Sequence, residues 1–203
     1  MPEDVAPAEV WLEVRDEAAG CRRCPLYKLG TQTVFGEGPT DAKLILVGEQ
    51  PGDQEDTAGR PFVGPAGRVL DLALSEAGIK RSETYVTNAV KHFKHEMRGK
   101  RRLHQKPNAG EIDICKWWLD RELAIIPSKV IVALGATAAR SLIGRPVKIE
   151  ATRGKPMPYL PGRQLVVTIH PSMLLRLPDP ADKTREMQRF VHDLDAVARM
   201  IDD

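Results

Sequence analysis

The sequence predicts a three-layer α/β/α sandwich, in which helices cover both faces of a short four-stranded parallel sheet. Four short apolar runs are typical of buried strands, and helical segments separate them. Strands that alternate with helices favour a parallel sheet covered on both sides. The 203 residues are 42% hydrophobic and 29% charged, which is enough for one buried core. We therefore expect a single domain over residues 1–203.

The first half of the chain supplies two of these strands. A helix is expected over 7–19, ahead of a Cys-x-x-Cys segment. "AKLILVG" (42–48) is an apolar run that ends in glycine, as buried parallel strands often do. After a long loop and a helix near 66–78, "TYVTNAV" (84–90) forms the second strand.

The second half repeats the alternation. A helix over 108–126 begins at Asn108, which is a suitable N-cap. "KVIVALG" (129–135) is the third strand, and the helix "ATAARSLIG" follows it. "QLVVTIH" (164–170) is the fourth strand, and a last helix covers about 182–201.

Some classes of protein are excluded by simple patterns. No apolar run approaches the roughly 20 residues that a membrane helix needs. The start "MPEDVAPAEV" lacks a basic segment followed by an apolar one, so we expect no secretory leader. We expect a cytoplasmic protein with no membrane partner, and a monomer by default.

Polar side chains follow the predicted strands where ligands bind in α/β folds, beyond the carboxyl ends. "GEQPGDQED" has no nucleotide-binding motif, but it offers Glu49 and a Pro-Gly turn with backbone amides free to receive an anion. Asn88 ends the second strand and could read the edge of a planar base. His170 ends the fourth. These features also have simpler interpretations: the Glu49 segment as a solvated acidic loop, Asn88 as a turn-stabilising residue and His170 as a capping or packing residue.

A strongly basic loop follows the second strand. Seven lysines and arginines lie between Lys91 and Lys106, against one glutamate, and His104 comes directly behind "KRRL". This charge predicts a polyanionic partner. A histidine in such a loop is ordinarily a phosphate contact, and the residues alone do not indicate more.

Three cysteines exclude a framework in which every cysteine is paired. Cys21 and Cys24 form "CRRC", a spacing that favours metal or redox chemistry in a cytosolic chain. Three thiolates with one imidazole suit tetrahedral zinc.

Several separated blocks carry a resemblance to a known family: "CRRCPLY", "VFGEGP", "LILVGEQPGDQEDTAGRPFVGPAG", "YVTNAVK", "LGATAARSL" and "TIHPSMLLR". Their order and spacing resemble the uracil-DNA glycosylase superfamily, in its iron–sulfur, family 4-like branch. Two departures resemble the X class of that superfamily, whose members attach covalently to DNA at uracil. "KHFK" stands where the family usually has Lys-Cys-Arg-Pro-Pro, and "KRRLH" is an addition.

The resemblance implies a cofactor. The family's ligands map to Cys21, Cys24 and Cys115, with His92 in the fourth place and His95 as a weaker competitor. These residues can hold a [4Fe–4S] cluster, although all-cysteine ligation is usual. Zinc is the alternative occupant.

The resemblance also implies a substrate, uracil in DNA, with single strands preferred because the base must leave the stack. Phe62 should stack on uracil, and Asn88 should bond its Watson–Crick edge. His170 should stabilise the departing anion, with Glu49 orienting His104, which captures the sugar. The remaining substrate-binding residues are Gln50, Asp53, Arg102 and Arg176.

Two other functions stay open. A turning-over glycosylase would release uracil, leave an abasic site, and use His104 only to hold phosphate. A non-catalytic, metal-stabilised DNA-binding protein would need neither Glu49 nor His170.

Overall fold

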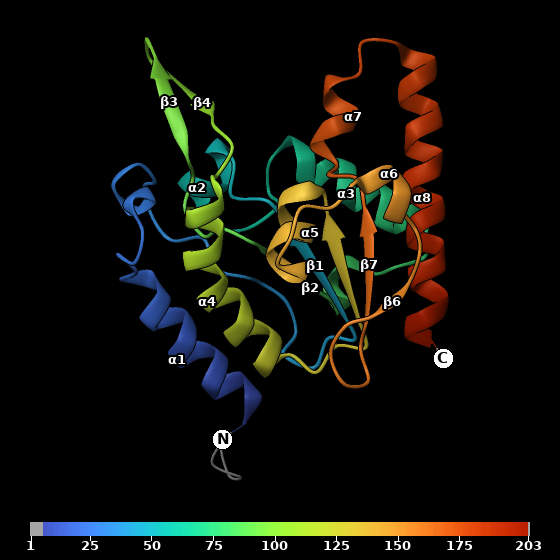
Figure 1. Ribbon diagram of the computed structural model, residues 1–203, viewed down its shortest axis with the longest axis horizontal. Coiled ribbons are helices and arrows are strands. Elements are labelled where there is room, and N and C mark those ends of the chain that lie inside the picture. Colours follow the sequence, from blue (N-terminus) through green and yellow to red (C-terminus); the bar gives the residue numbers. More distant parts are fainter. Residues whose placement is uncertain (1–5, 203) are drawn as a thin grey trace.

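The computed structural model describes residues 6–202, and its centre is a five-stranded sheet in the order β2-β1-β5-β7-β6 (Figure 1). The strands are β1 (Leu44–Gly48), β2 (Thr84–Asn88), β5 (Val130–Leu134), β6 (Met157–Pro158) and β7 (Gln164–Thr168). The four predicted strands are present and parallel, so the α/β fold class is confirmed. The fifth, β6, pairs antiparallel with β7 at the edge, which makes the sheet mixed and corrects the count of four.

Helices cover both faces of this sheet. The predicted ones are α1 (Pro7–Ala19), α3 (Pro65–Glu76), α4 (Ala109–Ile125), α5 (Ala136–Ile143) and α8 (Pro180–Asp202). Short turns of helix that the sequence did not reveal are η1 (Pro25–Lys28), α2 (Asp53–Ala58), η2 (Arg81–Glu83), α6 (Ile149–Thr152) and α7 (Ser172–Arg176). Within residues 6–202, no helix is long and apolar enough to cross a membrane.

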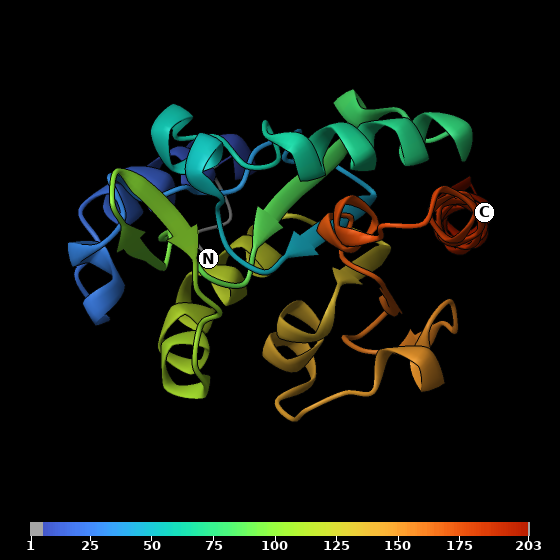
Figure 2. The same cartoon turned by 90° about the horizontal axis from the view of Figure 1, so that it is seen from above.

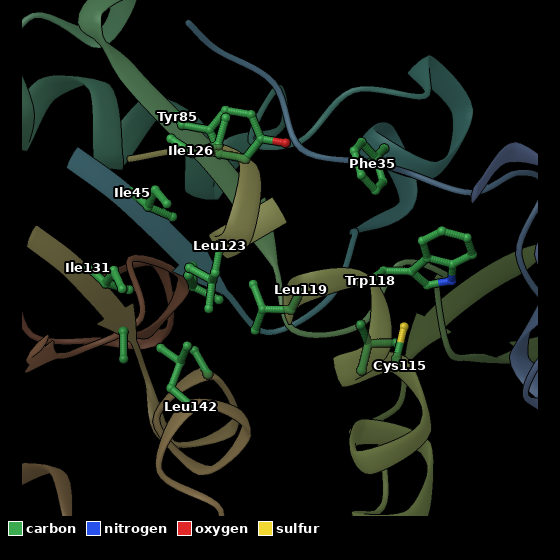
Figure 3. Close-up of a cluster of buried hydrophobic side chains, with 14 of the residues drawn as sticks. Phe35, Ile45, Tyr85, Cys115, Trp118, Leu119, Leu123, Ile126, Ile131 and Leu142 are labelled. Carbon is green, nitrogen blue, oxygen red and sulfur yellow. The ribbon is translucent and has the colours of Figure 1, made fainter. Parts of the chain in front are cut away.

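Two hydrophobic cores flank the sheet because successive strand residues point to opposite faces. Ile45 and Ile131 face a core closed by α1, α4 and α5, whose side chains Figure 3 shows around Trp118 and Leu119. Leu46 and its neighbours face a second core with α3 and α8. Figure 2 shows the helices on the two sides of the sheet.

The carboxyl ends of the parallel strands are level. Gly48 of β1 stands beside Asn88 of β2, and Leu134 of β5 stands beside Thr168 of β7. Side chains that follow these positions therefore emerge at one edge, as the sequence predicted.

The basic segment is not a plain loop, and that expectation was wrong. It forms an antiparallel hairpin of β3 (His95–Arg98) and β4 (Arg101–His104), which stands away from the main sheet (Figure 1). A two-residue turn joins the strands, and Gly99 supplies the positive φ of 61° that such turns require. His104 pairs with His95 at the base of the hairpin, so pairing fixes its position relative to the sheet edge.

A buried ion pair lies directly behind β2. Lys91 and Glu122 are both fully buried, and Nζ of Lys91 lies 2.5 Å from Oε2 of Glu122. Lys91 also donates to the Asn88 carbonyl at 2.8 Å, while Tyr85 and Thr87 donate to the Glu122 carboxylate. Every charge in this group thus has partners, which a buried charge requires.

Candidate active site

A pocket of about 760 Å³ opens at the carboxyl edge of the sheet. It lies beside the base of the hairpin and beside α7, and it is lined by residues from several strand ends. Seven of the predicted site residues line it: Glu49, Gln50, Phe62, Asn88, His104, His170 and Arg176. The fold therefore brings together most of the residues that the sequence singled out.

Glu49 is held on both of its carboxylate oxygens. Oε1 lies 3.1 Å from Nε2 of His104, and Oε2 accepts a hydrogen bond from the hydroxyl of Thr137. Burial alone would raise the pKa of Glu49, but the hydrogen bonds from His104 and Thr137 outweigh it, aided by the proximity of the His104 and His170 imidazoles. The net pKa lies below its usual value, so Glu49 is a carboxylate at neutral pH.

His170 is a neutral imidazole. Burial lowers its pKa to about 4, opposed by the charge of Glu49 and assisted by the positive charge of Arg176 and by the nearby His104 imidazole. Its Nδ1 accepts a hydrogen bond from the backbone N–H of Ser172 at 3.2 Å. Since the neutral ring has a single proton, that proton lies on Nε2, which is left as the donor.

Asn88 and Phe62 approach each other over β1 because Gly48 has no side chain. A Cβ at Gly48 would lie 2.4 Å from Oδ1 of Asn88 and 2.6 Å from Cζ of Phe62. The Phe62 ring also stacks on His170, with ring centroids 6.2 Å apart and planes at 29°. An aromatic face, an amide and an imidazole thus lie together in one pocket.

The backbone of Phe62 is strained. Its φ of 56° is left-handed, which a bulky residue rarely adopts. A Cβ at Gly67 would lie 1.8 Å from the Phe62 carbonyl oxygen, so only glycine allows this packing. Such strain persists where the surroundings over-determine it, typically at functional sites.

Gln50 lines the pocket but uses its side chain to hold the hairpin. Its Nε2 donates to the carbonyls of Lys94, at 3.1 Å, and Gln105, at 3.2 Å. Its Oε1 accepts from the Lys94 amide. One amide therefore bridges both ends of the hairpin and holds His104 at the pocket.

Arg102 and Asp53, both predicted to bind substrate, are not among the pocket-lining residues. Nε of Arg102 lies 2.5 Å from Oδ1 of Asp53, and its Nη1 lies 2.6 Å from Oδ2 of buried Asp56. These ion pairs fasten β4 to α2. Their position indicates that both residues brace the hairpin.

The sequence missed several residues of this site. Thr137 contacts Glu49, Ser172 contacts His170, and Lys106 lines the pocket. The sequence did contain a signal for Thr137. It is the second residue of a helix that starts directly after a predicted strand, so it lies at the carboxyl edge of the sheet where ligands bind. Nothing in the sequence linked Lys91 to Glu122.

The three cysteines are buried and free of disulfides. Trp118 donates from Nε1 to Sγ of Cys21 at 3.1 Å, and the Lys91 amide donates to Sγ of Cys115 at 3.2 Å. Burial raises the pKa of Cys115 to about 12, opposed by Lys91 and reinforced by Cys24 and Cys21. Three thiols that influence one another, with N–H donors on their sulfurs, have the surroundings of metal ligands.

His92 is buried close to Thr33, whose hydroxyl lies 3.0 Å from Nε2. Its Nδ1 is buried without a partner among the described residues. Burial lowers the pKa of His92, partly opposed by the charge of Asp56. A neutral imidazole with one unused nitrogen has the chemistry of a ligand.

These four residues are not assembled as a site for a single ion. Between residues 6 and 202, no three His, Cys, Asp or Glu side chains are close enough together to hold one metal ion.

Comparison with known proteins decides the family. The family described as "Uracil DNA glycosylase superfamily" matches residues 35–195, which include every pocket residue named above. The chain belongs to the uracil DNA glycosylase superfamily. The observed α/β fold agrees with this assignment.

Three of the relatives that this chain resembles carry the same name. The chain is 39% identical over 179 residues to a "Type-4 uracil-DNA glycosylase" of Thermotoga maritima. This alignment spans 88% of this chain and 87% of that protein. Proteins of the same name from Pyrobaculum aerophilum and Sulfurisphaera tokodaii are 36% and 33% identical. Those alignments span 78% and 82% of this chain and 81% and 76% of the relatives.

Proposed function

We propose that this protein excises uracil from DNA and that His104, in place of water, captures the sugar. The observation that carries the proposal is the pocket at the sheet edge, where Glu49 contacts His104 beside Asn88, Phe62 and His170. Superfamily membership and the names of the relatives support uracil excision. The contact between His104 and Glu49 supports capture.

Base recognition would use the aromatic face and the amide. Phe62 offers a surface on which a flipped pyrimidine can stack, and Asn88 offers a donor and an acceptor at fixed positions. Cytosine presents the opposite donor and acceptor pattern at N3 and at the group on C4, so binding it would leave buried polar groups unpaired. That mismatch would select uracil.

Breaking the glycosidic bond sends its electron pair to uracil and leaves an oxocarbenium-like sugar. A neutral His170 can donate its Nε2–H to the oxygen on which negative charge develops. Arg176, also at the pocket, favours the same charge. Both groups would stabilise the departing anion without giving up a proton.

Capture requires a lone pair on His104. Because Nε2 contacts the Glu49 carboxylate, a neutral ring bears its proton there and leaves the lone pair on Nδ1. Nδ1 would form a bond to the anomeric carbon as the carbon–nitrogen bond to uracil breaks. Glu49 would balance the resulting positive charge. Loss of the Nε2 proton would leave a neutral imidazole adduct with no good leaving group, so turnover would stop.

Hydrolysis is the second candidate function. The relatives are named simply as uracil-DNA glycosylases, which supports turnover more than capture. In this reaction Glu49 would activate a water molecule, and the products would be uracil and an abasic strand. His104 would then act only as a contact for phosphate.

A denaturing gel separates these functions. Protein is mixed with single-stranded DNA that contains one uracil, with a thymine strand as control and the duplex form alongside. A uracil-dependent protein–DNA band that resists heat and detergent supports capture. Free protein with an alkali-cleavable strand supports hydrolysis instead. If neither product forms, uracil excision itself is contradicted and only DNA binding is left.

We also propose a [4Fe–4S] cluster held by Cys21, Cys24, Cys115 and His92. The support is the family resemblance, the three buried thiols and the unused Nδ1 of His92. The cluster would fasten the chain after α1 to α4 and to the segment behind β2. Iron and acid-labile sulfide in equal, stoichiometric amounts would support it, and a colourless protein with stoichiometric zinc would overturn it.

A further inference from the structure

An exposed group of aromatic and basic side chains lies outside the pocket, where η1 meets α4. We call it the Trp117 patch, and it consists of Arg22, Arg23, Tyr27, Lys28 and Trp117. Buried Trp118 of α4 donates a hydrogen bond to Cys21, which lies just before η1, and its neighbour Trp117 is 46% exposed. The site described above uses none of these side chains.

Cations surround the two rings of the patch. The guanidinium carbon of Arg23 lies 4.5 Å from the Trp117 ring centroid. Arg22 and Lys28 lie 5.9 Å and 5.8 Å from the Tyr27 centroid. These cation–π contacts hold the charged groups beside flat aromatic surfaces.

The positive charges of the patch are not neutralised locally. Among the described residues, no carboxylate forms an ion pair with Arg22, Arg23 or Lys28. Arg121, whose guanidinium carbon lies 5.9 Å from the Trp117 centroid, is by contrast paired with Glu17. The patch therefore presents three cations without ion-pair partners, the exposed Trp117 ring and the partly buried Tyr27 ring, which matches a polyanion with flat bases.

The chain directly after η1 connects the patch to the basic hairpin. Nη1 of Arg102 donates to the Thr31 hydroxyl at 3.0 Å, just beyond η1. A Cβ at Gly30 would lie 3.2 Å from the Phe93 amide, so the chain after η1 packs against the start of the hairpin. Both views show this blue segment beside β3 and β4 (Figure 1, Figure 2). The patch and the hairpin that carries His104 are therefore joined through one packed segment.

We propose that the Trp117 patch binds the single-stranded DNA that flanks the uracil. Its arginines and lysine contact phosphates, and its rings stack on bases, as in single-strand binding proteins. The inference rests on the proposed function, because it takes DNA as the substrate. An acidic protein segment is the competing occupant, but contact with the hairpin favours the DNA strand.

Two patch variants and one matched control test this proposal. Arg22→Gln/Arg23→Gln removes two charges from the patch, and Trp117→Leu removes its larger ring. Lys43→Gln/Lys129→Gln removes two charges at the amino ends of β1 and β5, on the opposite edge of the sheet. Binding to uracil-free oligothymidine of about 4 and about 16 nucleotides is measured by fluorescence anisotropy at several salt concentrations.

Only binding of the longer strand should change. We expect Trp117→Leu to weaken it about tenfold. The double arginine variant should reduce the slope of log K against log salt by about 1.4, since each phosphate contact contributes about 0.7. Binding of the shorter strand should match wild type, as should the control. Wild-type affinity for the longer strand in both variants would overturn the proposal, as would an equal loss in the control.

Uracil release from a short strand distinguishes a failure of the patch proposal from a failure of the proposed glycosylase function. Unchanged release in the patch variants shows that they are folded with an intact pocket. If wild-type protein releases no uracil, the proposed function is contradicted, while the anisotropy comparison still decides whether the patch binds DNA.

Discussion

Nε2 of His104 lies 3.1 Å from Oε1 of Glu49, although one residue ends a protruding hairpin and the other follows a central strand. The contact exists because two anchors hold the hairpin down. Gln50 bridges both of its ends, and Arg102 pairs with Asp53 and Asp56 on α2. The carboxylate and imidazole face each other before any substrate arrives, which is the preorganisation that a reacting pair needs.

Replacing His104 separates capture from excision. His104→Ala should abolish the protein–DNA band, because the attacking nitrogen is gone, while uracil release continues with water as the acceptor. Denaturing gels and a free-uracil assay measure the two outcomes. His95→Ala is the matched control, since His95 pairs with His104 across the hairpin, and it should retain the adduct. A heat-stable band in His104→Ala would contradict the assignment.

Thr137 should act by positioning Glu49. Thr137→Val removes the donor to Oε2, which weakens one of the interactions that lower the pKa of Glu49. The active form is the carboxylate, so the rate falls as pH falls through this pKa. Without the hydroxyl, the pKa of Glu49 rises and that acidic limb should move to higher pH.

The measurement is the rate of uracil release or adduct formation against pH. Thr137→Ser keeps the hydroxyl and should restore the wild-type profile. The groups that also face Glu49 or line its pocket are His104, His170, Lys106, Arg176, Glu55 and Glu150, and they are unchanged in both variants. An unshifted limb in Thr137→Val would show that the hydroxyl does not act on Glu49.

The low pKa of His170 should make the free energy of unfolding depend on pH. The unfolded chain takes up a proton near the ordinary value of 6.5, whereas the folded protein does so only near about 4. Between these values the unfolded state binds more protons, so stability falls as pH falls through that window. Urea unfolding of wild type should show this fall, and His170→Asn should show less of it. Parallel curves for the two proteins would contradict a neutral His170.

Removing only one charge of the buried Lys91–Glu122 pair should strongly destabilise the folded protein. Lys91→Met leaves a buried carboxylate without its cation and should lower the free energy of unfolding by about 3–5 kcal/mol. Lys91→Met/Glu122→Gln removes both charges but keeps an acceptor for Tyr85 and Thr87. It should recover part of the loss in urea unfolding. A double variant less stable than Lys91→Met would show that the charge is not the cause.

Gly48 should be intolerant of any side chain. In Gly48→Ala the new methyl group meets both Asn88 and Phe62, so these groups must shift by about 1 Å. Displacement of that size typically costs about 100-fold in rate, which kcat/KM for uracil release would report. Gly110→Ala, whose new Cβ would lie an ordinary 3.6 Å from Oδ1 of Asn108, controls for replacing a glycine outside the pocket. Wild-type kcat/KM in Gly48→Ala would mean that the pocket is not the uracil site.

Local patterns identified most of the fold. The four apolar runs became the four parallel strands, and Asn108 caps α4 through its side chain, which accepts from Glu111. Strand ends also predicted the site, since Glu49, Asn88 and His170 lie where parallel strands finish. These features follow from neighbouring residues and from the common direction of the strands, so sequence is sufficient to find them.

Only the tertiary structure decided how distant side chains pair. Arg102 and Asp53 were expected at the substrate but bind each other, and Gln50 uses its amide to hold the hairpin. Thr137 on Glu49 and Lys91 against Glu122 were not foreseen at all. Composition and motifs place polar residues near an edge, but the partner of each one depends on packing geometry between elements far apart in the chain. Hydrogen bonds act over about 3 Å, and no local pattern specifies which groups come that close.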